Sequence, residues 1–130
     1  MTIADDAPCH AHVYFSPGER EAAERLRDTF ARRKEAADEI VFVGRMTEGK
    51  AGPHPIPQFE VHFLGRSFAG VVAAIEESRL RALVHPLTDD DLADHTSLGH
   101  WIGEKIELDL TTLDPPGRNQ GVSRFGKTDF

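Results

Sequence analysis

Two segments of this chain share one layout: a short stretch in which polar and apolar residues alternate, followed directly by a helix start. The first is CHAHVYF, residues 9–15, which leads into SPGE, residues 16–19. SPGE fits a capping box, with serine at the N-cap, proline at the first helical position and glutamate at the third. The second is FEVHF, residues 59–63, which leads to Ser67 as the cap of another helix. This repeated order of strand and helix constrains the fold more than any other feature.

Other segments supply the elements between and after these pairs. Apolar residues at helical spacing extend the first helix to about Ala36. Residues 40–46, IVFVGRM, are β-branched and apolar and predict a strand, and residues 80–85 predict another that stops at the following proline. Residues 48–58 contain three prolines and two glycines and therefore predict a loop.

The order strand, helix, strand, strand, helix, strand is the split βαβ arrangement. We therefore predict an α+β, ferredoxin-like antiparallel sheet with both helices on one face. A short helix capped by Thr88 and a fifth strand at residues 106–110 would extend it as an added C-terminal helix and strand. At this length a single domain is expected over residues 1–113, and the polar, glycine-rich residues 114–130 are expected to form a loose tail.

Side-chain parity predicts what each face of this sheet presents. Residues two apart in a strand share a face, and the topology places the first strand between the third and the fourth. The apolar sets Ala11/Val13/Phe15, Phe59/Val61/Phe63 and Ala82/Val84 should face the helices. The opposite face would carry His10, His12, Tyr14, Glu60, His62, Arg81, Leu83 and His85. We expect residues 88–110, a second subunit, or both to cover that face and to leave a pocket beneath the cover.

Composition excludes several classes of protein. The formal charge of −7 and a pI near 5.4 argue against a protein that binds nucleic acid by neutralising phosphates. No apolar run is long enough to cross a bilayer, and the first residues lack the pattern of a secretory signal, so we expect a cytoplasmic protein without membrane contact. The one cysteine, Cys9, excludes an internal disulfide and a cysteine-based zinc cage.

The seven histidines are the residues most suggestive of chemistry. Neutral imidazole is the commonest metal ligand, and several histidines with or without a carboxylate suit iron, zinc, manganese or copper. Glu60 could supply a carboxylate, and the prolines of the GPHP turn would hold His54 stiffly at the edge of the sheet. A strand histidine such as His62 is also typical of a surface or hydrogen-bonded position, and Tyr14 suits an interface equally well.

Three motifs, in the same order along the chain, resemble the DOPA 4,5-dioxygenase family. They are HAHVYF, GPHP followed by FEVHF, and LVHPLTDDDLADHTSLGHWIGEKIELDL, and together they span about residues 10–110. The resemblance implies a ferredoxin-like fold, commonly a homodimer, and a small aromatic ring-cleaving enzyme. Its activity would be extradiol cleavage of a DOPA-like or caffeate-like catechol by ferrous iron and dioxygen.

The resemblance also implies a role for individual residues. Ferrous iron would be held by His12, His54 and His85, a set that zinc also accepts. Proton transfer would fall to His95 or His10, and substrate contacts to Tyr14, Glu60, Arg81 and Trp101, with Arg81 paired to a substrate carboxylate. The chain departs from the family at Leu98, where relatives carry a histidine. Two alternatives therefore stay open: a metal- or ligand-binding dimer without turnover, and a fold whose histidines only pack and hydrogen-bond.

Overall fold

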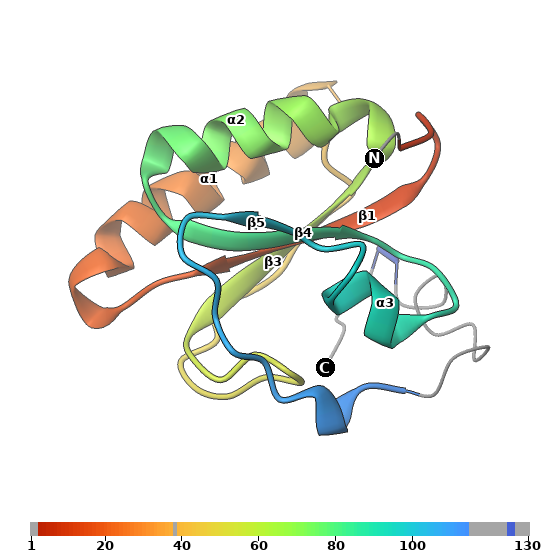
Figure 1. Ribbon diagram of the computed structural model, residues 1–130. Helices are drawn as coiled ribbons and strands as arrows, with labels where there is room; N and C mark the ends of the chain where they lie inside the picture. The colour runs from red at the N-terminus through yellow and green to blue at the C-terminus, as the bar shows by residue number, and fades with distance from the viewer. Residues whose placement is uncertain (1–2, 38, 115–124, 127–130) are drawn as a thin grey trace.

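The computed structural model describes residues 3–37, 39–114 and 125–126, and its centre is an antiparallel sheet in the order β2-β3-β1-β4-β5. The strands are β1 (Pro8–Tyr14), β2 (Phe42–Val43), β3 (Gln58–Leu64), β4 (Arg81–Pro86) and β5 (His100–Ile102). The α-helices are α1 (Arg20–Ala37), α2 (Phe68–Ser78) and α3 (Asp91–His95). Helices α1 and α2 lie on one face of the sheet and α3 lies on the other (Figure 1). The predicted ferredoxin-like class, with β1 between β3 and β4, is confirmed.

The start of α1 follows from its capping box. The Glu19 carboxylate accepts a hydrogen bond from the backbone N–H of Ser16 at 3.0 Å, and one turn of 3₁₀ helix, Pro17–Glu19, leads into α1. At the far end of α2, Arg79 adopts a left-handed conformation with φ of 65° and turns the chain into β4. Helix α2 begins directly after Ser67, so both helices begin where the sequence predicts them.

The main hydrophobic core lies between the sheet and the two long helices. The three apolar sets predicted to face the helices are all buried there, together with Phe30 of α1 and Ile75 of α2. Phe59 and Phe63 are fully buried, and burial of a side chain of this size contributes about 1.5–3 kcal/mol. The parity prediction for this face is thus confirmed, and the polar strand residues are left on the opposite face.

The predicted fifth strand is wrong in position. β5 lies at His100–Ile102 and pairs with β4, whereas residues 106–109 form no strand. Ile106 and Leu108 instead pack over Tyr14 and Leu83 on the polar face of the sheet. A chain that crosses a sheet face in extended form alternates between inward and outward side chains as a strand does, so its sequence pattern is the same.

Two further boundaries differ from the prediction. The strand predicted at residues 40–46 is reduced to Phe42–Val43, although Gly44 continues the pairing through a 2.7 Å bond from its N–H to the carbonyl of Glu60. The cap of α3 is Asp90, whose side chain accepts from the N–H of Ala93, whereas the Thr88 hydroxyl donates to Asp94. Within the part of the chain described, no helix combines the length and apolar character that a membrane crossing requires.

Candidate metal centre

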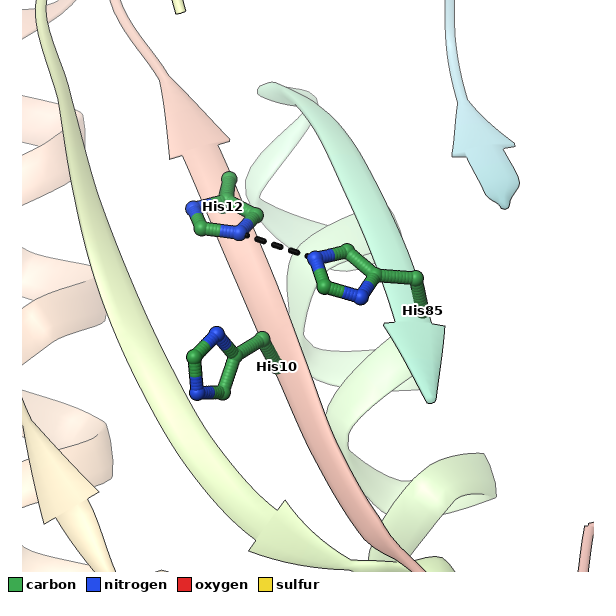
Figure 2. Close-up of side chains that lie close together, drawn as sticks. All are labelled: His10, His12 and His85. Carbon is green, nitrogen blue, oxygen red and sulfur yellow. Dashed lines mark hydrogen bonds between the residues drawn. The ribbon is translucent and has the colours of Figure 1, made fainter. Parts of the chain in front are cut away.

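The register of the three central strands gathers the histidines of the polar face. His10 on β1 lies opposite His62 of β3 on one side and His85 of β4 on the other. His12, two residues along β1, lies opposite Glu60 and Leu83. The Nε2 atoms of His12 and His85 are 3.0 Å apart, and both rings project from neighbouring strands toward each other (Figure 2).

Two segments outside the sheet add one histidine each. The GPHP turn is closed by a pair of backbone hydrogen bonds between Ala51 and His54, and it places the His54 ring 4.0 Å from that of His12 between centroids. Helix α3 brings His95 to within 4.3 Å of the His85 ring, again between centroids. Asp94 anchors α3 by accepting from the backbone N–H and the hydroxyl of Thr88. The predicted residues His12, His54, His85 and His95 therefore meet beneath the cover.

In each of these four histidines the Nδ1 atom lies against a protein oxygen. The contacts are His12 to Gln58 Oε1 at 3.3 Å, His85 to the Pro86 carbonyl at 2.8 Å, His95 to the Asp91 carbonyl at 2.8 Å and His54 to the Tyr14 hydroxyl at 2.7 Å. A carbonyl only accepts, so the Nδ1 atoms of His85 and His95 carry the proton, and the lone pair of a neutral ring is then on Nε2. This outward anchoring of Nδ1 is the usual support of metal-bound histidine.

The donor set fits a transition metal on this evidence. Two ligands about 2.1 Å from one ion lie roughly 3.0–3.4 Å apart, which matches the 3.0 Å between the Nε2 atoms of His12 and His85. Three groups have donor atoms within 4.8 Å of one another among the described residues: His10/His12/His85, His12/His54/His95 and His10/Glu60/His62. His12 belongs to the first two groups, and both offer only nitrogen ligands, which suit iron or zinc.

The third group, His10/Glu60/His62, is less suited to a metal because one nitrogen of His62 is engaged in another contact. The backbone N–H of Gly126 donates to His62 Nδ1 at 2.9 Å. A neutral His62 must then carry its proton on Nε2, and this atom lies 3.5 Å from Glu60 Oε1. His62 therefore presents a protonated Nε2 near a carboxylate, without a hydrogen bond between them, and has no lone pair to offer to a metal. The His10 ring stacks on the His62 ring, with 3.6 Å between centroids and 17° between planes. His10 therefore lies between the pair formed by Glu60 and His62 and the group that contains His12.

Burial keeps His10, His12, His54 and His85 uncharged. Desolvation, and then the neighbouring imidazoles, hold the pKa values of His10, His12 and His85 well below the ordinary 6.5. Burial followed by the charge of His95 lowers the pKa of His54 to about 3. Burial also raises the pKa of Tyr14, which keeps its hydroxyl protonated. At neutral pH His10, His12, His54 and His85 are therefore neutral imidazoles, the form in which histidine binds metals.

The residues predicted to contact substrate lie in different surroundings. Tyr14 is fully buried and its ring stacks with Trp101 at 6.1 Å between centroids. Trp101 and His95 line a cavity of about 240 Å³, together with Thr96, Lys105, Ile106, Glu107, Leu108 and Leu110. Glu60 is buried beside His62, and Arg81 lies against Gly103, outside that lining.

Sequence reasoning missed several residues that support the site. Gln58 shares the face of Glu60 and His62, so the parity of β3 could have identified it as the partner of His12. Asp91 lies four residues before His95 on the same helix, so helical spacing could have identified it as a neighbour of His95. The contact of Gly126 with His62 has no signal in the sequence, because it depends on how the chain returns to the sheet. Most of the predicted tail, residues 114–130, lies outside the described residues.

Comparison with known proteins decides the family. A profile of the Dopa 4,5-dioxygenase family matches residues 9–112. The chain belongs to this family. It is 36% identical over 110 residues to DOPA 4,5-dioxygenase of Amanita muscaria, an alignment that covers 80% of this chain and 48% of that protein. The predicted family is therefore confirmed.

Two further relatives extend this comparison. An uncharacterised 21.2 kDa protein of Botryotinia fuckeliana is 33% identical over 112 residues, which are 78% of this chain and 61% of that one. The chain thus spans about half to three fifths of the length of these curated relatives. The crystal structure of a candidate dioxygenase from Nostoc punctiforme is 34% identical, with a TM-score of 0.73 over 83% of this chain and 91% of that one.

Proposed function

We propose that this chain is an iron(II)-dependent extradiol dioxygenase that opens the ring of a catechol with dioxygen. The observation that carries the proposal is the convergence of His12, His54, His85 and His95, whose Nδ1 atoms are anchored on protein oxygens. Membership of the Dopa 4,5-dioxygenase family supports the reaction class. We further propose a homodimer in the cytoplasm, which sedimentation analysis and cell fractionation would test.

The proposed ligands are His12, His54 and His85. Ferrous iron at these nitrogens would supply a common binding point for the two catechol oxygens and for dioxygen. The residues around the ligands fix their direction: Gln58 orients His12, the backbone at Pro86 orients His85, and Tyr14 orients His54. Because Tyr14 keeps its proton, the neutral His54 has its Nε2 lone pair available only when Nδ1–H donates to the Tyr14 oxygen.

Between the two candidates for proton transfer, the cavity favours His95. His95 lines the cavity beside Trp101, and its Nδ1 is held by the Asp91 carbonyl, so Nε2 is the atom that can accept a catechol proton. His10 is fully buried and stacked on His62, away from the cavity lining. We therefore assign His95 as the general base and His10 to the support of the pair formed by Glu60 and His62.

The test is anaerobic reconstitution with ferrous iron, followed by a screen of DOPA, caffeate and protocatechuate for oxygen uptake and a yellow ring-opened product. We expect turnover with at least one of these catechols, its loss in His85→Ala, and its retention in His100→Ala, because His100 is exposed at the edge of the sheet. If iron binds and no catechol is turned over, the dioxygenase proposal is wrong and a metal-binding role without turnover takes its place.

A further inference from the structure

One of the proposed metal ligands lies on a turn outside the sheet. His54 belongs to the GPHP turn, whereas His12 and His85 are fixed in the hydrogen-bonded ladder between β1 and β4. The two backbone bonds that close the turn join Ala51 and His54, so they fix the shape of the turn and not its position over the sheet. The position of His54 therefore depends on contacts between the turn and other parts of the chain.

The segment that follows β5 supplies two such contacts. Residues 103–113, here called the strap, cross the polar face of the sheet beside the turn (Figure 1). The backbone N–H of Asp109 donates to the carbonyl of Pro53 at 2.9 Å, and Pro53 directly precedes His54. The carboxylate of Asp109 accepts from Lys50 Nζ at 2.6 Å, at the start of the turn. One residue of the strap thus contacts the turn at two points.

The strap is itself held against the sheet. Ile106 and Leu108 pack on the polar face, so the strap has an apolar attachment of its own. The hydrogen bonds from Lys50, and then those from Thr111, lower the pKa of Asp109 to about 2, and its carboxylate is therefore charged at neutral pH. The contact between Lys50 and Asp109 is thus an ion pair that joins a loop to an anchored segment.

Burial of the ligands makes the cover of the polar face a barrier to metal exchange. The side chains of His12, His54 and His85 have no exposed surface. A metal ion held by these histidines therefore leaves only after part of the cover has moved. The turn is a part that takes a ligand with it, because His54 belongs to it. Movement of the turn away from the sheet both opens the centre and removes one ligand.

We propose that Lys50 and Asp109 form a latch that positions His54 and thereby controls how fast the centre releases its metal. The closed latch holds the turn against the strap and keeps His54 beside His12. When the ion pair breaks, the turn can carry His54 away from the centre. Lys50 and Asp109 are positioning residues, since they act through the turn. This inference rests on the proposed function, because it takes His54 as a ligand of the same centre.

The test is the anaerobic release of ferrous iron from the loaded full chain to an excess of a chromogenic chelator, which needs no substrate. The ion pair is exposed, with 57% of the Lys50 side chain and 31% of the Asp109 side chain accessible, so its loss should have the modest effect of an exposed pair. We expect Lys50→Met and Asp109→Asn each to release iron about two- to fivefold faster than the wild type. The double variant should be no faster than either single one, because both changes remove the same contact.

Three further variants calibrate the measurement. Lys50→Arg keeps the ion pair and should release iron at the wild-type rate. Lys34→Met removes a charge from an exposed position on α1, far along the chain from the turn, and should also leave the rate unchanged. His54→Ala removes the ligand itself and should release iron more than about tenfold faster, beyond the effect of losing the latch.

The outcomes separate the latch from the proposed function. Wild-type release rates in Lys50→Met and Asp109→Asn, with fast release in His54→Ala, would overturn the latch and leave the ligand set intact. An acceleration that Lys50→Arg or Lys34→Met shares would also overturn the latch. An unchanged rate in His54→Ala, or no iron bound by the wild type, would overturn the ligand assignment and the latch with it. The expected rates without turnover of any catechol would refute the dioxygenase and leave the latch supported.

Discussion

The metal-free protein should unfold steeply in mild acid because of its buried histidines. His10, His12, His54 and His85 all have pKa values lowered by burial, so the folded protein does not take up protons at these positions. In the unfolded chain the same side chains titrate near 6.5. As the pH falls below this value, protonation therefore stabilises the unfolded state and leaves the folded state unchanged.

The size of the effect follows from proton linkage. The contribution of these histidines to the free energy of unfolding is constant above about pH 6.5. Below that pH it declines by up to about 1.4 kcal/mol per pH unit for each histidine, or roughly 5.5 kcal/mol per unit for the four. A domain with about 5–15 kcal/mol of stability then unfolds within about one to three units. Asp94 acts in the opposite direction, since burial raises its pKa and the folded state binds its proton first. At the lower pH values of this range, the proton bound by Asp94 offsets the destabilising effect of about one histidine.

The assay is urea unfolding of the metal-free protein, followed by circular dichroism at a series of pH values between neutrality and the acid limit. His10→Gln should reduce the slope of stability against pH by about a quarter, because one of the four groups no longer titrates. His100→Gln is the matched control, since His100 is exposed and its replacement should leave the slope as it is. A wild-type slope no larger than that of one histidine would refute the reasoning.

Three further predictions concern the site and the core. His12→Ala should lose bound metal while His62→Ala retains it, because the lone pair of His62 Nδ1 already accepts from the Gly126 N–H; metal analysis that finds the reverse would reassign the site. Gln58→Leu should weaken metal affinity about 10–100-fold by removing the support of His12, and chelator competition showing no change would exclude this role. Phe59→Ala should cost about 3–5 kcal/mol in urea unfolding, and a cost below about 1 kcal/mol would contradict its burial.

The sheet was predictable because strand periodicity is local. Alternation in residues 9–15 and 59–63 determines which side chains share a face, and the split βαβ order then decides which strands are neighbours. The same periodicity gave a wrong prediction at residues 106–110. There the apolar Ile106 and Leu108 alternate with polar residues because the segment packs over the sheet and does not pair with it. Periodicity cannot distinguish these two cases, since both are extended chains with one buried side.

The candidate site was predictable only in part. Parity places His10, His12 and His85 on one face, whereas His54 was suggested by the prolines of its turn and His95, on a short helix, only by the family resemblance. Which nitrogen of each ring faces inward depends on partners from other parts of the chain, such as Gln58. Those contacts depend on tertiary packing, so no local pattern reveals them.

A crystal structure of the iron-loaded protein, with anomalous scattering recorded at the iron absorption edge, tests the central claim most directly. The account predicts one iron peak within about 2.0–2.2 Å of Nε2 of His12, His54 and His85. A peak among His10, Glu60 and His62, or no ordered iron on this face of the sheet, would contradict it.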